Sequence, residues 1–135
     1  FSMTGERRDL NREKFDFDKL LTQLEDKNSI ASQNLKILSN AMKIRSKIKS
    51  FHPSAEMKCL TKGRSDIVAI QRGFENSSII AIHNITDNKL DFSIDDFPSF
   101  LKDTCTYCDY LSGKEYSNSN FVLDPFQVLW IGKNK

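Results

Sequence analysis

Cysteine is scarce in this 135-residue chain, which contains only Cys59, Cys105 and Cys108. An odd and small number of cysteines argues against a disulfide framework and suits a reducing compartment. No apolar run approaches the roughly 20 residues that a membrane helix needs. The first residues do not combine a basic segment with an apolar run, as a signal peptide does. We therefore expect a cytoplasmic chain that does not enter a membrane.

A strong excess of charge is also absent, because the net charge is only +2. This balance gives no electrostatic reason to expect a nucleic acid partner. Apolar residues make up 39% and charged residues 28% of the chain, which is typical of a folded soluble protein.

The common catalytic and cofactor motifs are missing as well. We find no nucleophile elbow, phosphate-binding loop or dinucleotide fingerprint. Cys105 and Cys108 have the spacing of half a zinc site, but the second pair of ligands is missing. The only histidines, His52 and His83, are expected to cap or pack. The sequence therefore predicts no catalytic residue, metal or cofactor in this chain.

The first third of the chain has helical periodicity. A short helix is expected from about 17 to 24, with Asp16 or Asp18 as its N-cap. A second helix is expected from about 30 to 50, with Ser29 as its N-cap. Its apolar stripe is wide, and it comprises Leu35, Leu38, Met42, Ile44 and Ile48. Such a stripe packs either on the rest of this chain or on a partner such as a barrel.

After Pro53, which stops the second helix, the pattern changes to that of strands. We expect strands at 56–61, 66–71, 78–84, 89–94, 104–111 and 121–131, with glycine, proline and asparagine turns between them. The segments 66–71 and 78–84 predict an antiparallel hairpin. Short, evenly spaced strands favour an antiparallel β-sandwich. The predicted fold class is mainly β with N-terminal helices.

The segment 4–12, T-G-E-R-R-D-L-N-R, is similar to the T-G-x-x-R-D-I-N-R segment of sucrose phosphorylases and their relatives in the α-amylase superfamily. An aromatic and acidic stretch at 15–18 and a long helix follow it, as they do in that family. The segment 51–55, F-H-P-S-A, resembles the start of the family's C-terminal β-domain.

Three further segments resemble motifs inside that β-domain. They are I-H-N-I-T-D at 82–87, D-Y-L-S-G at 109–113 and L-D-P-F-Q-V-L-W-I at 123–131. The departures from the family pattern are mild apolar exchanges at Leu10, Tyr110 and Phe126.

The resemblance implies that an intact parent enzyme carries a (β/α)8 barrel before this chain. Its aspartate nucleophile and glutamate acid/base would transfer glucose from sucrose or a related α-glucoside to phosphate with retention. Residues 1–50 would be the end of the barrel, with the loop after its eighth strand and its last helices. Residues 51–135 would be the C-terminal antiparallel β-domain. The chain by itself would be a non-catalytic fragment.

Arg12 is the one candidate site residue that the resemblance implies. It matches an arginine on the acceptor side of the family's active site, where a guanidinium suits phosphate or sugar hydroxyls. In the isolated chain Arg12 is expected to be a solvated arginine of a charged loop.

Two other functions remain open from the sequence. The chain could be a free-standing carbohydrate-binding β-sandwich, or the C-terminal domain of an α-amylase-type glycoside hydrolase. In the isolated fragment, the barrel-facing stripe of the second helix could be exposed and mediate a homodimer.

Overall fold

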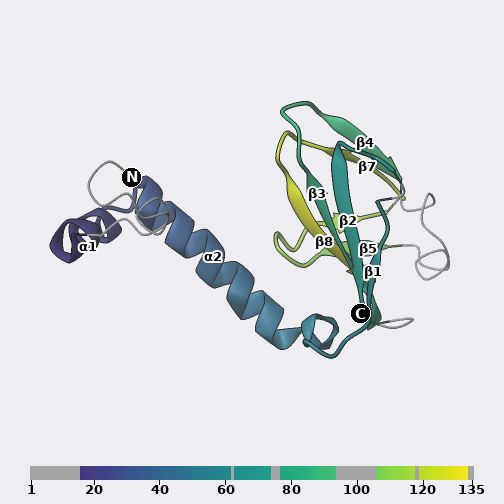
Figure 1. Cartoon of the computed structure of the whole chain (residues 1–135), viewed down its shortest axis with the longest axis horizontal. Helices are drawn as coiled ribbons and strands as arrows, with labels where there is room; N and C mark the ends of the chain where they lie inside the picture. Colours follow the sequence, from purple (N-terminus) through teal and green to yellow (C-terminus); the bar gives the residue numbers. More distant parts are fainter. Residues whose placement is uncertain (1–15, 62, 74–76, 94–105, 118, 134–135) are drawn as a thin grey trace, which may run out of the picture. The chain divides into compact units, whose positions relative to one another are not determined.

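The computed structural model describes residues 16–61, 63–73, 77–93, 106–117 and 119–133. The chain forms two compact units, Phe1–Asn40 and Ala41–Lys135, and the boundary between them falls within the second helix. Figure 1 shows the helices in the N-terminal part of the chain and the strands in the C-terminal part.

The two predicted helices are present. Helix α1 is Phe17–Glu25, and the carboxylate of Asp16 accepts a hydrogen bond from the amide of Lys19 at 3.1 Å, which identifies Asp16 as its N-cap. Helix α2 is Ile30–Lys47. The hydroxyl of Ser29 accepts a hydrogen bond from the amide of Ser32 at 3.0 Å, so Ser29 caps α2 as predicted.

The end of α2 differs from the prediction of about residue 50. The helix ends at Lys47, because Ile48 is extended with φ −104° and ψ 110°. A short 3₁₀ helix, η1, follows at Lys49–Phe51. Ser50 and Phe51 contact the β-domain there, so tertiary packing ends the helix before Pro53 can do so.

The strands are β1 (Met57–Cys59), β2 (Ile67–Arg72), β3 (Ile79–Asn84), β4 (Leu90–Ser93), β5 (Tyr107–Asp109), β6 (Glu115–Tyr116), β7 (Asn120–Leu123) and β8 (Val128–Lys133). The single strand predicted at 121–131 is wrong. Asp124–Gln127 form a turn that separates β7 from β8, closed by the amide of Gln127 on the carbonyl of Asp124 at 3.1 Å. The two-residue strand β6 was not predicted, because it is too short to produce a pattern.

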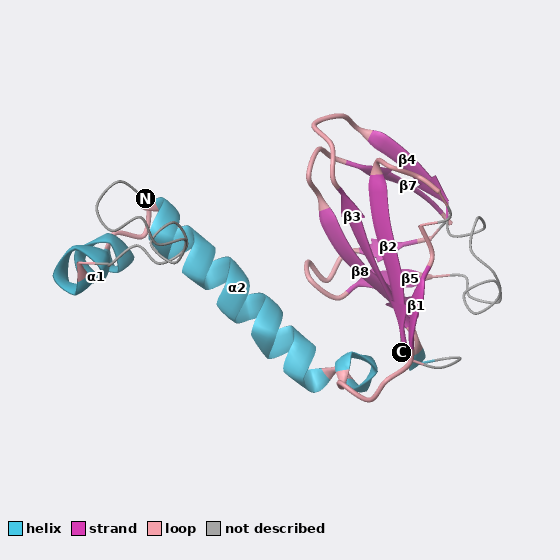
Figure 2. Ribbon diagram, viewed as in Figure 1, coloured by secondary structure: helices cyan, strands magenta, loops and turns pink. Residues whose placement is uncertain are grey.

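The strands form two antiparallel sheets. One has six strands in the order β1-β2-β3-β8-β5-β6, and the other pairs β4 with β7. The predicted hairpin is confirmed as β2 and β3, with Ile67 opposite Asn84 and Arg72 opposite Ile79. Figure 2 shows the strands of both sheets in the β-domain.

The hydrophobic core contains residues of both sheets, and it gives the β-domain its sandwich-like character. Phe121 of β7 lies at ring-centroid distances of 4.7 Å from Tyr116 and 6.2 Å from Tyr107, which belong to the six-stranded sheet. The buried cluster comprises Leu60, Ile67, Ala69, Ile80, Ile82, Phe92, Tyr107, Phe121, Leu123, Leu129 and Ile131. The predicted fold class, N-terminal helices followed by an antiparallel β-sandwich, is confirmed.

The helices keep their apolar side chains accessible. No residue of α1 or α2 is buried, and the exposed fractions are 52% for Leu35, 64% for Leu38 and 59% for Met42. The stripe on α2 is therefore open to a partner. None of the helices in the described residues has the length and apolarity to cross a membrane.

Candidate functional site

Over β2, β3 and β8 the six-stranded sheet is mostly apolar on both of its faces. Ile80 and Ile82 of β3 lie in the core, so the alternating residues Ile79, Ala81 and His83 lie on the opposite face. The cross-strand neighbours extend this opposite face over β2 and β8. We define the outer face as Val68, Ile70, Arg72, Ile79, Ala81, His83, Val128 and Trp130. An antiparallel sheet commonly carries polar side chains on a solvated face, so this face has the composition of a packing surface.

One end of the outer face is covered by the segment 48–55, which we call the junction. The ring of Phe51 lies 4.6 Å from the ring of Trp130, with an angle of 53° between the two planes. Aromatic pairs contribute about 0.5–1.5 kcal/mol beyond the area that they bury. The junction is thus packed on the outer face.

Polar contacts fix the junction at the same place. Ser50 is buried, and its hydroxyl donates to the carbonyl of Ser77. The guanidinium of Arg72 donates to the carbonyl of His52 at 2.7 Å. Gly73 has φ +85°, and a Cβ there would lie 2.9 Å from Ser50 Cβ. A larger residue than glycine would therefore both strain the backbone and push the junction away.

Exposed apolar side chains lie just beyond the end of β3 and around the start of β8. Ile85, two residues beyond His83, is 52% exposed, and Phe126 is 66% exposed. Val128, which pairs with His83, is 37% exposed. We call Ile85, Phe126 and Val128 the open patch.

Phe126 has a strained backbone. Its φ is +55°, and among the described residues no other residue except glycine has a positive φ. For a side chain of this size the left-handed region costs about 1–2 kcal/mol. Its amide donates to the carbonyl of Thr86 at 3.0 Å. The surrounding structure therefore holds this aromatic ring in an exposed position against a conformational cost.

Asn84 ties together the two turns that present the open patch. Its side chain is buried, and its amide group donates to the carbonyls of Asn88 at 2.7 Å and Asp124 at 2.9 Å. Its carbonyl oxygen accepts from the amide and the hydroxyl of Thr86. The segments 82–87 and 123–131 of the resemblance thus lie side by side.

The segment 109–113 forms a turn around a buried carboxylate. Asp109 accepts hydrogen bonds from the amides of Leu111 and Ser112, from the hydroxyl of Ser112 and from the amide of Trp130. The phenol of Tyr110 donates to the carbonyl of Lys133 at 3.1 Å. These contacts fix the turn after β5 to the neighbouring strand β8. Asp109 and Tyr110 therefore have a structural role.

His83 is the titratable group at the centre of the outer face. It is half-buried between Val68 and Val128, and this burial lowers the pKa of its imidazole. Burial thus disfavours the charged form of His83, as suits a residue of a packing surface. The structure places His83 half-buried on a sheet face, where it packs as expected.

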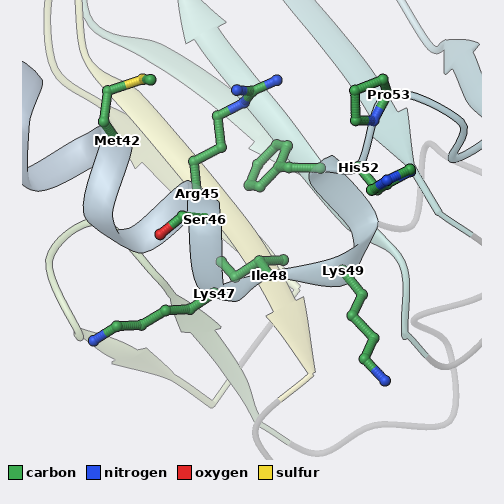
Figure 3. Close-up of a pocket in the computed structure, with 9 residues that line it drawn as sticks. Met42, Arg45, Ser46, Lys47, Ile48, Lys49, His52 and Pro53 are labelled. Carbon is green, nitrogen blue, oxygen red and sulfur yellow. The ribbon is translucent and has the colours of Figure 1, made fainter.

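A pocket of about 520 Å³ lies along the junction and the last turn of α2. Figure 3 shows that the side chains of Lys47 and Lys49 extend from it in different directions. Its lining combines basic and apolar residues: Met42, Arg45, Ser46, Lys47, Ile48, Lys49, Phe51, His52 and Pro53. The lining holds no carboxylate, so this pocket lacks the paired acids of glycoside chemistry.

Two residues considered in the sequence analysis, the proposed acceptor-site Arg12 and Cys105, lie outside the residues that the structure describes. Cys108 is half-buried in β5, where burial and the charges of Asp109 and Glu115 raise its pKa. Within the described ranges, no group of three or more potential ligands could hold a metal ion. His52 accepts a hydrogen bond from the amide of Ser54 at 3.2 Å, which makes it a local cap as expected.

The fold is similar to that of parts of two larger solved structures. A crystal structure of AmyP in complex with maltose matches 77% of this chain with a TM-score of 0.60 and 17% identity. A mutant of trehalose-6-phosphate hydrolase from Bacillus licheniformis matches 82% of the chain with a TM-score of 0.56 and 14% identity.

These likenesses concern the fold, since both identities are low. The chain spans about a fifth of the length of each of these two structures, 21% and 20%. No protein-family model matches the sequence. No curated protein matches it either.

Proposed function

We propose that this chain is the non-catalytic C-terminal part of an α-amylase-family enzyme. The observation that carries the proposal is a β-domain of this fold whose six-stranded sheet is mostly apolar on both faces over β2, β3 and β8. The small sheet covers the inner face, and the junction covers one end of the outer face. In the proposed parent enzyme the catalytic barrel would cover the exposed remainder around Val128.

The parent enzyme in this proposal is a sugar phosphorylase of the sucrose phosphorylase type, located in the cytoplasm. Support comes from the segment 4–12, which is similar to that branch of the superfamily. The enzyme would transfer glucose from sucrose or a related α-glucoside to phosphate. Residues 1–50 would complete the barrel, and Arg12 would bind the phosphate or the leaving sugar.

A glycoside hydrolase is the second candidate for the parent. The fold likeness to trehalose-6-phosphate hydrolase favours it as much as a phosphorylase, because the β-domain carries no catalytic group that would separate the two. A free-standing carbohydrate-binding module is less well supported. Such modules stack sugars on rows of aromatic rings, whereas in the described part of the β-domain only Phe126 is an exposed aromatic residue.

The exposed stripe of α2 also supports association of the isolated chain with itself. Burial of a Leu or Met side chain contributes roughly 1.5–3 kcal/mol, so pairing of Leu35, Leu38 and Met42 between two copies would stabilise a dimer. In the parent enzyme the same stripe would lie against the barrel.

The test begins with the gene sequence upstream of Phe1, followed by an assay of the full-length protein with sucrose and phosphate. Glucose 1-phosphate as product supports the phosphorylase, and free glucose without use of phosphate supports the hydrolase. A gene with no catalytic domain before this chain overturns the proposal.

A further inference from the structure

We propose that the pocket along the junction binds a small organic phosphate. The phosphate group contacts Arg45, and an apolar body lies against Met42, Ile48 and Phe51. The proposal does not depend on the proposed function, because every residue that forms the site lies within 42–53. It follows from the distribution of charge along the chain, from the composition of the lining and from the way in which one wall of the pocket is fixed.

Positive charge is concentrated around this pocket. The stretch 27–55 contains six of the 20 lysine and arginine residues of the chain and none of its 18 aspartate and glutamate residues. Three of these six, Arg45, Lys47 and Lys49, line the pocket. In the part of the chain that the structure describes, none of the three forms an ion pair. The uncompensated charge therefore favours an anionic ligand.

The C-terminal end of α2 does not cancel this charge. A helix C-terminus carries about half a negative elementary charge, which is small beside the charges of Arg45, Lys47 and Lys49. One of the terminal carbonyls, that of Arg45, already accepts a hydrogen bond from the amide of Ile48 at 3.2 Å. The electrostatic potential at the pocket therefore remains positive.

Arg45 is the residue that we expect to contact the anion. In Figure 3 the side chains of Lys47 and Lys49 extend in different directions, so they do not converge on one anion. Arg45 extends on the side of Met42 and Pro53 in the same view. A guanidinium group presents a planar pair of donors that matches the oxygens of a phosphate. We therefore assign the direct contact to Arg45 and a longer-range attraction to the two lysines.

The size and the remaining lining favour an apolar body on the anion. The volume of about 520 Å³ lies in the range of sites for small organic molecules. The apolar part of the lining comprises Met42, Ile48, Phe51 and Pro53. Of the uncharged polar residues, Ser46 donates its hydroxyl to the carbonyl of Lys43, and His52 accepts from the amide of Ser54. A phosphate ester of an apolar alcohol therefore suits this lining better than a free sugar does.

The wall that the junction contributes is fixed by the β-domain. The guanidinium of Arg72 donates to the carbonyl of His52 at 2.7 Å, and the ring of Phe51 lies 4.6 Å from that of Trp130. A preformed wall loses little conformational freedom when a ligand binds, which favours affinity. The stacking also makes Trp130 a reporter, because a ligand on Phe51 changes the surroundings of the indole.

The experiment titrates the chain with three probes while the emission of Trp130, its single tryptophan, is recorded. Calorimetry repeats each titration. Benzyl phosphate has the charge and the apolar body, inorganic phosphate has only the charge, and benzyl alcohol has only the apolar body. We expect saturable binding of one benzyl phosphate per chain, with an affinity roughly tenfold higher than that of either other probe.

The variant Arg45→Gln removes the proposed contact. The matched control Lys43→Gln removes the same charge from the same helix at a residue outside the lining. Arg45→Gln should weaken the binding of benzyl phosphate about fivefold, as the loss of one well-aligned exposed ion pair does, and Lys43→Gln less than about twofold. Both residues are exposed, so the urea unfolding of the two variants should resemble that of the wild type.

Equal losses of affinity in Arg45→Gln and Lys43→Gln would show that only the general positive charge attracts the ligand, and they would overturn the site. Binding of inorganic phosphate or benzyl alcohol as tightly as benzyl phosphate would overturn the assigned ligand class. A further variant, Met42→Asp, places a carboxylate in the lining and should weaken benzyl phosphate as well. Retained affinity in Met42→Asp, or the absence of saturable binding to the wild type, would contradict the proposal.

Discussion

Phe51 and Trp130, separated by 79 positions in the sequence, stack with their ring centroids 4.6 Å apart. Phe51 belongs to the junction that leads out of α2, and Trp130 to β8 near the middle of the sheet. Their contact packs the junction on the β-domain.

Phe51→Ala is expected to destabilise the β-domain by about 2 kcal/mol. Complete burial of a phenylalanine corresponds to a loss of about 3–5 kcal/mol on truncation, and Phe51 is only half-buried. The Trp130 emission should shift to longer wavelength, because the indole gains contact with water. Urea unfolding followed by that emission measures both effects, with exposed Lys49→Ala as the control. A change no larger than that of the control would show that the stack does not hold the junction.

Asp109→Asn is expected to cost about 3 kcal/mol of the free energy of unfolding. The carboxylate accepts four hydrogen bonds in a buried position, and an amide nitrogen cannot replace an acceptor oxygen without leaving donors unpaired. The exposed Asp91 of β4 offers the same chemical change as a control. Thermal unfolding of both variants should separate them clearly, and similar melting temperatures would contradict the assigned role.

The stability of the chain should decrease as the pH falls below about 6.5, the usual pKa of histidine. Burial lowers the pKa of His83 in the folded chain. As the pH falls, His83 is therefore protonated in the unfolded chain before it is protonated in the folded chain. The free energy of unfolding then falls from about pH 6.5 until the lowered pKa of folded His83 is reached.

His83→Gln should remove this part of the pH dependence, whereas His52→Gln should keep it. The measurement is urea unfolding of the three chains between about pH 5 and about pH 8. An unchanged slope in His83→Gln would mean that His83 does not contribute to the acid sensitivity.

Arg12→Ala in the full-length enzyme is expected to lower turnover by about ten- to hundredfold. The loss of one charge-assisted contact corresponds to about 1.5–3 kcal/mol, and each 1.36 kcal/mol is about tenfold in rate. The use of phosphate should suffer more than formation of the glucosyl-enzyme. Arg7→Ala in the same segment is the control. Unchanged kinetics would remove Arg12 from the site, and a large fall in melting temperature would make its role structural.

The sequence predicted the elements whose signals are local. Ser29 and Asp16 cap helices because the hydroxyl or carboxylate and the amide that it accepts from are three residues apart. The hairpin of β2 and β3 follows from two apolar strands with a short connection. The apolar run Ile79–Ile82 at the start of β3 also indicates that both faces of this strand are buried.

The remaining features depend on contacts between distant residues. The helix α2 ends at Lys47 because Ser50 and Phe51 pack on a sheet formed later in the chain. The turn at Asp124–Gln127 is fixed by Asn84, forty positions away. The open patch combines Ile85 and Phe126 from separate segments of the chain. It could not be predicted from the sequence pattern around either residue.

Product analysis tests the proposal that this chain is the non-catalytic end of a sugar-converting enzyme. Glucose 1-phosphate and glucose are determined after incubation of sucrose and phosphate with the isolated chain and, in parallel, with the full-length protein. We expect glucose 1-phosphate from the full-length protein and no product above the protein-free control from the isolated chain. Product from the isolated chain, or a full-length protein without activity on any α-glucoside, would contradict it.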